Sequence, residues 1–186
     1  GDASSLSELL RSSDDKYHPG LTVKDNGQVE LAGSGLTVAD GDVVARNVTG
    51  KTATLTANRN LTLVESQLGT TGDLNLLARD TVRVRDSVAN PFVAQAGGNL
   101  TIRGDRGIDI LALNHPQTPF VSGGNLSLIS DGTISGDAHF FSGGNFSILN
   151  LSGGGGNFIS LYDPIIRSNG DVEIGEYRGA SLMIES

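Results

Sequence analysis

A short phrase that occurs three times constrains this chain more than any other feature of its sequence. The phrase places a glycine pair and an asparagine before alternating apolar residues, and it reads "AQAGGNLTIRG" from Ala94, "FVSGGNLSLIS" from Phe120 and "FFSGGNFSILN" from Phe140. Successive copies begin 26 and then 20 residues apart. A repeat of this length indicates that the chain stacks copies of one structural unit.

The repeat divides the chain into segments that begin at an Asn or Asp following a glycine. Four full segments and a partial one occupy Asp73–Gly98, Asn99–Gly124, Asn125–Gly144, Asn145–Gly170 and Asp171–Ser186, and two diverged copies precede them at Gln28–Lys51 and Thr52–Gly72. Each segment holds three short apolar pieces, and the first alternates with period two, as in Leu126 and Leu128. Such alternation predicts a strand with one buried face. Three strands per segment predict a triangular coil, so we expect an all-β parallel β-helix of about seven coils.

Several recurring residues are expected to stack along the axis of this solenoid. Asparagines linked by hydrogen bonds form the first predicted column, a glycine pair with special backbone angles precedes each of them, and an interior apolar column follows a proline column. The asparagine column is Asp73, Asn99, Asn125, Asn145 and Asp171; the glycine pairs are 97–98, 123–124 and 143–144; the apolar column is Phe92, Phe120, Phe140 and Ile165; the prolines are Pro91, Pro119 and Pro164, with His139 in the short segment.

Segment length is expected to vary only in outward loops, because stacking fixes the strands. The segment Asn125–Gly144 is interpreted as a bare coil, and about six extra residues in its neighbour are assigned to a projecting loop at Asn114–Thr118. At the N-terminus, leucines at helical spacing predict a short amphipathic helix within residues 1–26, which acts as a cap or linker before the repeats at residues 27–186. No such cap is visible at the other end, so the coil Asp171–Ser186 is expected to be an interface for end-to-end contacts.

The composition narrows the function classes. The net charge of −8 disfavours nucleic acid as a partner, and the absence of cysteine excludes disulfides and thiolate metal sites. Neither a membrane-spanning apolar stretch nor a signal peptide is visible, so the chain is interpreted as mature, processed or excised from a longer one.

No catalytic, cofactor-binding or metal-binding residue is predicted. The carboxylates and histidines tested for catalysis are Asp109, His115, Asp131, Asp137, His139 and Asp163. Asp109 is placed in a strand, whereas Asp131 and Asp137 are placed at turns, so they form no evident acid–base pair. "GDRGID" occurs once, too rarely for a calcium array, and "SGGGGN" lacks the lysine of a phosphate loop. The chain is therefore not expected to be an enzyme.

Asn-x-Ser/Thr triplets are interpreted as structural rather than as glycosylation signals, because three of them follow the repeat. They begin at Asn47, Asn60, Asn99, Asn125, Asn145 and Asn150.

The phrases "GGNLTIRGDRGIDILAL", "SGGNLSLISDGTISGDAHFFSGGNFSI" and "DPIIRSNGDVEIGEY" resemble the filamentous-haemagglutinin-like exoproteins of two-partner secretion systems, and above all their cyanobacterial branch. This resemblance, which covers Gln28 to Ser186, implies a right-handed β-helix. It also implies export through a dedicated outer-membrane transporter and an adhesive or structural role outside a Gram-negative-type cell. The family's secretion domain carries an Asn-Pro-rich signature, and this chain has only Asn90-Pro91, so it is expected to be an internal or downstream piece.

The sequence thus favours an extracellular β-helical scaffold or adhesin that contacts surface glycans or proteins. The alternative is a carbohydrate-active β-helix (a polysaccharide lyase or hydrolase) or a carbohydrate-binding one, in which Tyr162 and Tyr177 would serve as exposed stacking surfaces.

Overall fold

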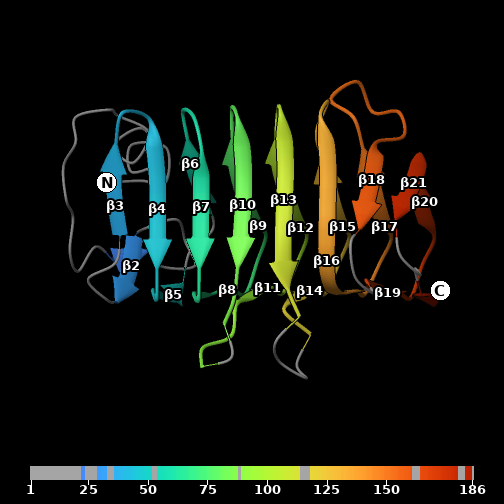
Figure 1. The fold of residues 1–186 in the computed structure, drawn as a ribbon. Helices are drawn as coiled ribbons and strands as arrows, with labels where there is room; N and C mark the ends of the chain where they lie inside the picture. Colours follow the sequence, from blue (N-terminus) through green and yellow to red (C-terminus); the bar gives the residue numbers. More distant parts are fainter. Residues whose placement is uncertain are drawn as a thin grey trace.

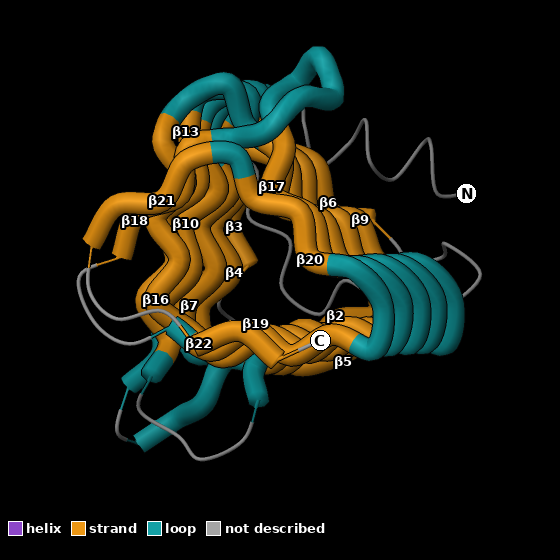
Figure 2. Tube along the Cα trace, turned by 90° about the vertical axis from the view of Figure 1, so that its right-hand side faces the viewer, coloured by secondary structure: helices purple, strands orange, loops and turns teal. Residues whose placement is uncertain are grey.

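The computed structural model describes residues 22–23, 29–32, 36–51, 54–87, 89–113, 118–160, 164–179 and 183–185. Every regular element among these residues is a β-strand, and no helix occurs among them. The strands line three curled sheets that surround one apolar core (Figures 1 and 2). This all-β arrangement of mostly parallel strands is compatible with the predicted parallel β-helix. The helix predicted near the N-terminus lies outside the described residues.

The three sheets are named here A, B and C in the order in which the chain visits them from residue 36 onward. Sheet A contains β3 (Leu36–Ala39), β4 (Asp42–Arg46), β7 (Leu61–Val64), β10 (Thr81–Arg85), β13 (Gly107–Ala112), β16 (Thr133–Ser142), β18 (Asn157–Ser160) and β21 (Glu176–Gly179). Sheet B contains β1 (Thr22–Val23), β2 (Val29–Ala32), β5 (Thr49–Lys51), β8 (Gln67–Thr70), β11 (Val93–Ala96), β14 (Phe120–Ser122), the second half of β16, β19 (Ile165–Ser168) and β22 (Met183–Glu185). Sheet C contains β6 (Thr54–Ala57), β9 (Leu74–Ala78), β12 (Leu100–Gly104), β15 (Leu126–Ile129), β17 (Phe146–Leu149) and β20 (Val172–Ile174).

The registers of sheet C confirm the alternating pattern read from the repeated phrase. Leu126 lies opposite Leu100 on one side and Phe146 on the other. All three side chains are fully buried. Alternate residues such as Ser127 face outward and are half-buried. Because a strand turns successive side chains to opposite faces, the apolar rows meet in the interior.

One member of the interior apolar column was predicted at the wrong position. Phe120 lies opposite Phe140, as expected, and their rings stack with centroids 5.0 Å apart. The next member of the column, after Phe140, is Ile166, which lies opposite Phe140 and is fully buried. Ile165 instead lies opposite His139 on the outer face. A shift of one residue exchanges the two faces of a strand, and the sequence contains an isoleucine at both positions.

The first phenylalanine of that column is displaced by two residues. Ala94, and not Phe92, lies opposite Phe120. Phe92 is still buried, and its ring centroid is 5.3 Å from that of Phe120. A displacement of two residues keeps the side chain on the same face of the strand, so Phe92 still contacts Phe120 in the interior although its register was predicted wrongly. The predicted proline column is also wrong, because Pro91 and Pro164 precede the displaced residues Phe92 and Ile165 and are displaced with them. Only Pro119 lies opposite His139, as predicted.

The segment predicted as a diverged coil at Gln28–Lys51 joins the parallel stack only in its second half, where β4 pairs with β7 and β5 pairs with β8. β3 pairs antiparallel with β4, and β2 pairs antiparallel with β5. Asp40 and Gly41 join β3 to β4 with φ values of 52° and 84°. A two-residue Asp-Gly loop with both φ positive matches the twist of an antiparallel hairpin. The sequence analysis did not predict this hairpin, although "VADGDV" contains the Asp-Gly pair that such a turn favours.

Extra residues leave the stack at two different corners. Seven residues separate Ala112 from Phe120, whereas His139 alone separates the opposite residues Ala138 and Phe140. The preceding loop, between β10 and β11, projects from the same corner (Figure 1). Residues 114–117 of the predicted loop lie outside the described residues. The segment Asn145–Gly170 also has extra residues relative to the short coil. Seven residues lie between Leu149 and Asn157, whereas three lie at the equivalent place in the short coil, so most of the extra residues are at the corner between sheets C and A.

Candidate functional site: the polar columns and the C-terminal face

A column of side-chain acceptors runs along the corner between sheets B and C. From Asp73 to Asn145, each side-chain oxygen accepts the backbone N–H of the next member. Asp73 Oδ1 accepts from Asn99 at 2.8 Å, Asn99 Oδ1 from Asn125 at 2.8 Å, Asn125 Oδ1 from Asn145 at 2.9 Å, and Asn145 Oδ1 from Asp171 at 2.9 Å. The predicted column is confirmed. Its donor is the backbone N–H and not the amide group, so Asp and Asn serve equally well.

Special backbone angles were predicted for the glycines of this corner, and this prediction was wrong: close approach of neighbouring backbones requires them. A Cβ on Gly124 would lie 2.5 Å from Asn99 Oδ1, and one on Gly123 would lie 2.2 Å from the carbonyl oxygen of Gly97. The backbone is equally close: Gly124 N–H donates to the carbonyl of Gly98 at 2.8 Å. The φ angles of these glycines lie outside the left-handed region. Figure 2 shows these corners stacked closely one behind another, and the hydrogen-bonded backbones leave no space for a side chain between them.

A row of buried serines supports the same corner and was missed in the sequence. Ser122 donates to the carbonyl of Gly124 at 2.9 Å, Ser142 to that of Asn145 at 2.8 Å, and Ser168 to that of Gly144 at 2.7 Å. All three side chains are buried. A polar residue at a core-facing position, repeated before each corner, was the available signal.

A second, shorter column lies on sheet A. Asp42 Oδ1 accepts the N–H of Asn60 at 2.9 Å, and Asn60 Oδ1 accepts the N–H of Thr81 at 3.3 Å. A fifth triplet asparagine, Asn150, accepts two backbone N–H groups within the loop that follows β17. The triplets at Asn60, Asn99, Asn125, Asn145 and Asn150 therefore all supply structural hydrogen bonds, as predicted for the repeat-linked ones.

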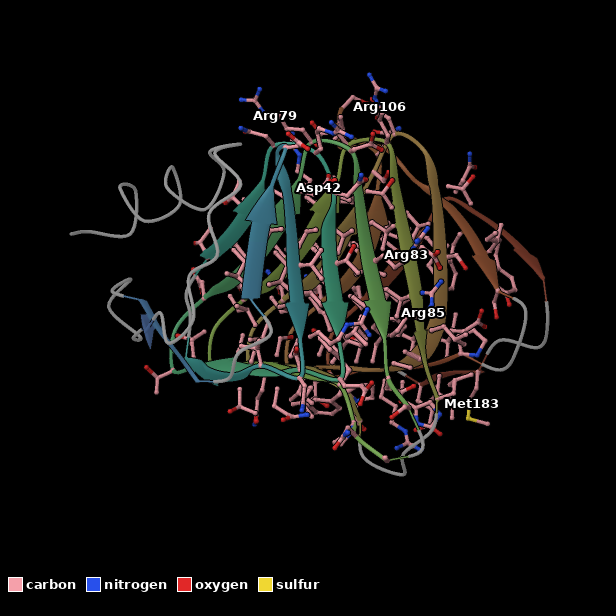
Figure 3. The ribbon with its side chains drawn as sticks, turned by 60° about the vertical axis from the view of Figure 1, so that its left-hand side comes forward. Asp42, Arg79, Arg83, Arg85, Arg106 and Met183 are labelled. Carbon is pink, nitrogen blue, oxygen red and sulfur yellow. The ribbon has the colours of Figure 1, made fainter. Side chains whose placement is uncertain are left out.

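The structure places two of the candidate carboxylates on neighbouring strands. Asp109 on β13 accepts Arg85 Nη2 at 2.8 Å and Arg83 Nε at 3.3 Å, and both arginines come from β10 (Figure 3). Asp137 lies two residues beyond Ser135, which is opposite Asp109. It stands inside β16 and not at a turn, so that prediction was wrong.

Neither carboxylate is presented as a free acid or base. The side chain of Asp137 is buried and accepts the hydroxyl of Ser160, and two guanidinium groups neutralise Asp109. Asp131 does lie at a bend, where its Oδ1 accepts the N–H of Leu151 at 2.8 Å. In "GDRGID", Asp105 pairs with Arg103 at 2.7 Å. His115 and Asp163 lie outside the described residues.

His139 occupies the outer face of sheet B in the short coil. Burial lowers its pKa below the usual 6.5, and the nearby Arg167 guanidinium lowers it further. Arg167 itself is paired with Glu185 at 3.1 Å. His139 is therefore held toward its neutral form, as expected of an imidazole beside a cation.

The C-terminal face of the stack is formed by the last strand of each sheet. β20, β21 and β22 each pair with a preceding strand, and each ends its sheet in the described part of the chain. Interior rows emerge here: Ile184 lies opposite the fully buried Ile166, yet it is 44% exposed, and Met183 is 52% exposed. Val172 and Ile174 are only partly buried. The interior rows are therefore less buried here than at the preceding levels of the described residues.

Tyr177 packs against the core and is not the exposed stacking surface that the carbohydrate-binding alternative predicted. It lies opposite Phe158, with ring centroids 5.3 Å apart, and is partly buried against the core. Tyr162 lies outside the described residues. Exposed carboxylates at Asp171, Glu173 and Glu185 surround the face. The side chain of Asp171, the last member of the corner column, has no hydrogen-bond partner among the described residues.

A shallow groove of about 220 Å³ lies on the outer face of sheet A. Its lining residues are Asp42, Val44, Asn60, Thr62, Thr81 and Arg83. These side chains offer both hydrogen-bond donors and acceptors on the outer face of parallel strands.

Comparisons with known proteins identify no relative: the chain matches no protein-family model, no curated protein and no solved structure. Within the described residues, no helix has the length and apolar character needed to cross a membrane. The same residues contain no group of three or more histidine or carboxylate side chains placed to hold a metal ion.

Proposed function

We propose that this chain is a rigid segment of an extracellular surface protein, a right-handed parallel β-helix of about seven coils with a structural or adhesive role. The observation that carries the proposal is the continuity of hydrogen bonding. Neighbouring coils are bonded through the sheets and also through the corner between sheets B and C, where Gly98, Gly124, Gly144 and Gly170 each donate to the coil before at 2.8 Å. A stack bonded around its perimeter resists bending and local opening.

The coil number and handedness rest on the strand order and on general topology. Sheet A contributes a strand to each successive level from β4 to β21, and sheet B does so from β5 to β22. Connections between parallel strands of one sheet are right-handed in nearly all proteins. The resemblance of the repeated phrases to filamentous-haemagglutinin-like exoproteins supports an extracellular site and export through an outer-membrane transporter.

The remaining partners follow from the same proposal. The loops at the corner between sheets A and B contact surface glycans or proteins, and the ends of the stack contact further coils. The net charge of −8 argues against nucleic acid. No enzymatic step is assigned, because Asp109 is ion-paired and Asp137 is buried.

Protease treatment of intact source cells tests the location. An antibody against the purified chain should detect it in the medium or on the cell surface, and added protease should remove the surface signal without lysis. A signal that resists protease until the cells are broken would contradict the proposal. A periplasmic marker protein controls for leakage.

A second candidate function, carbohydrate recognition, is favoured by the polar groove on sheet A. Arg83 is exposed at its edge, and Asp42 and Asn60 supply acceptors. Binding of acidic polysaccharides that is lost in Arg83→Ala, without loss of fold, would support this candidate. Chain cleavage of the same polysaccharides would show an enzyme and overturn the structural assignment.

A further inference from the structure

We propose that Asn47 is the acceptor of an N-linked sugar, which the protein carries at the corner between sheets A and B. Asn47 begins one of the six Asn-x-Ser/Thr triplets, the sequence that N-glycosylating enzymes recognise in exported proteins. This inference rests on the proposed extracellular role and adds to it a covalent modification at a defined position. Hydrogen bonding separates this triplet from the other five.

The other five triplet asparagines are each fixed through their side-chain oxygen, which accepts a backbone N–H. In the corner column, successive members also follow one another at the spacing of the coils, about 4.8 Å, so a sugar on Asn125 would lie against Asn145. In the loop after β17, the oxygen of Asn150 accepts the N–H groups of Ser152 and Gly154 at 3.0 and 2.9 Å. A transferase must hold the acceptor amide in its own active site, so transfer to any of these five requires local opening of the fold.

The side chain of Asn47 is exposed and makes no hydrogen bond to another described residue. Only its backbone is bonded, since its N–H donates to the carbonyl of Val64 at 2.8 Å. The hydroxyl of Thr49, the third residue of the triplet, is likewise exposed and without a partner in the described part of the chain. Val48 between them is fully buried, and its N–H donates to Ser66 Oγ at 3.1 Å. The valine anchors the triplet, and both recognised side chains face solvent.

The backbone conformation of this corner does not account for the asparagine. Asn47 has a φ of 56°, in the left-handed region that asparagine tolerates better than most residues. Glu65 occupies the equivalent place in the next coil and has a φ of 52°. Its carboxylate accepts the side-chain amide of Asn90 at 2.8 Å. The fold thus accepts a different residue at this position, and neither the polar columns nor the turn gives the amide of Asn47 a structural role.

The position of Asn47 has room for a bulky group. It lies between β4 and β5, at the corner where the connections of later coils lengthen into projecting loops (Figure 1). A sugar at this corner extends into solvent and leaves the strand pairing of both sheets intact. The corner between sheets B and C differs, because even a Cβ on Gly124 would lie 2.5 Å from Asn99 Oδ1.

The transfer is a substitution at an activated sugar. Nδ2 of Asn47 forms a bond to the anomeric carbon of a sugar that is linked through a diphosphate to a nucleotide or to a lipid carrier. The bond between the anomeric carbon and the diphosphate oxygen breaks, and the diphosphate leaves with the bonding electrons. One proton of Nδ2 passes to a base of the transferase, and no oxidant or reductant is required.

Glycopeptide mass spectrometry of the protein purified from its source cells tests the assignment. The peptide that contains Asn47 should carry a sugar mass, and the peptides that contain Asn99, Asn125 and Asn145 should be unmodified. An unmodified Asn47, or equal occupancy of the corner column, would overturn the proposal. A source-cell extract that glycosylates the recombinant chain identifies the donor: transfer that persists without the membrane fraction uses a nucleotide sugar, and transfer that is lost uses a lipid-linked sugar.

A purified transferase that attaches sugar from a nucleotide donor to Asn-x-Ser/Thr tests whether the fold selects the site. In the folded recombinant chain, Asn47 should be labelled, and the other five asparagines should react at least about tenfold more slowly, because their hydrogen bonds must open first. This preference should vanish in the denatured chain. Thr49→Ala should abolish labelling of Asn47, whereas Thr49→Ser should retain it. Labelling of Asn125 in the folded chain as fast as Asn47 would contradict the inference.

Asn47→Gln is the matched control for both measurements, because it removes the acceptor and keeps a side-chain amide. Thermal unfolding should show that this variant keeps the fold, since Glu65 occupies the equivalent corner. The modification and the proposed location fail separately. A chain that protease removes from the cell surface but that has no sugar on Asn47 refutes the modification alone, and a glycosylated chain found only inside the cell refutes the location alone.

Discussion

Two corners of the same coil obey opposite rules. The corner between sheets B and C has the same length in each of the four segments from Asp73 to Gly170, and it is bonded to the coils on both sides, as between Gly98, Gly124 and Gly144. The corner between sheets A and B is filled by His139 alone in one coil and by seven residues, Leu113–Pro119, in the coil before it. One corner belongs to the wall of the stack, and the other is a site where loops are added (Figure 1).

The difference shows what fixes segment length in a stacked chain. A corner keeps its length where its own backbone groups are donors and acceptors for the neighbouring coils. Where the backbone bonds within its own loop, as Ser87 N–H does with the carbonyl of Asn90 at 3.1 Å, residues can be inserted without disturbing the strands. Function that requires variation is therefore expected at the corner between sheets A and B.

The largest loss of stability is expected from a substitution in a strand, because the strands form the wall of the stack between the two corners. Leu126→Ala removes a fully buried side chain from sheet C and should lower the free energy of unfolding by about 2–5 kcal/mol. Chemical denaturation measures the change. Ile129→Ala, on the outer face of the same strand, is the matched control and should cost clearly less. Equal costs would contradict the assigned faces.

A glycine substitution should separate the tight corner from an ordinary turn. Gly124→Ala places a Cβ 2.5 Å from Asn99 Oδ1 and should destabilise the protein by about 1–3 kcal/mol, the usual cost of overpacking. Gly72 belongs to the same column, but a Cβ there meets nothing within 4 Å. Gly72→Ala should therefore be neutral in thermal unfolding. Similar losses for both variants would mean that backbone angles, and not close approach, require glycine.

Loss of one column acceptor should have a smaller effect. Asn125→Ala removes the acceptor for the N–H of Asn145 and should cost about 0.5–1.5 kcal/mol, toward the lower end because this corner is exposed to water. Asn125→Asp keeps the oxygen and should retain most of the stability. Denaturant titration of both variants tests whether acceptor geometry or amide chemistry matters.

The variable corner should tolerate a large change with little effect. Replacing Leu113–Pro119 with a single histidine converts the long connection into the one found in the short coil. The strands on either side keep their registers, so stability should change by less than about 1 kcal/mol. Calorimetry should still show one cooperative transition. A broad or absent transition would place the loop within the core structure.

The smallest effect concerns the pH response of the residue that fills this corner. His139 has a folded-state pKa below 6.5, chiefly through burial and then through Arg167. The unfolded chain therefore binds the proton more readily, so the contribution to stability falls as pH drops through 6.5 and is lost below the folded-state pKa. Arg167→Gln should move the pKa of His139 upward in an NMR titration. An unchanged or lower pKa would show that Arg167 does not act on His139.

Much of the wall could be predicted because its rules are local. Period-two alternation decides which side chains of a strand face the core, and it placed Leu100, Leu126 and Phe146 correctly. The asparagine column was also predictable, since a polar residue that recurs at each corner must be satisfied by its neighbour in the stack. The Asp40-Gly41 hairpin was not predicted, although its turn residues are typical of a two-residue hairpin loop.

Registers across the loops were decided only by the tertiary structure. Counting from a proline or a phenylalanine misplaced Phe92 and Ile165, because the number of residues in a loop does not reveal where the following strand resumes pairing. The burial of Asp137 depends in the same way on the course of β16 through a corner at which other coils turn outward.

The sequence by itself determined that this protein is a stack of short strands with an amide-lined corner, because strand periodicity and hydrogen-bonding chemistry repeat visibly along the chain. The tertiary structure decided why the corner needs glycine and how the first described strands pair. Those features depend on distances between coils, such as the 2.8 Å between Gly124 N and the carbonyl oxygen of Gly98. Residues 26 positions apart in the chain set that distance only after they have stacked.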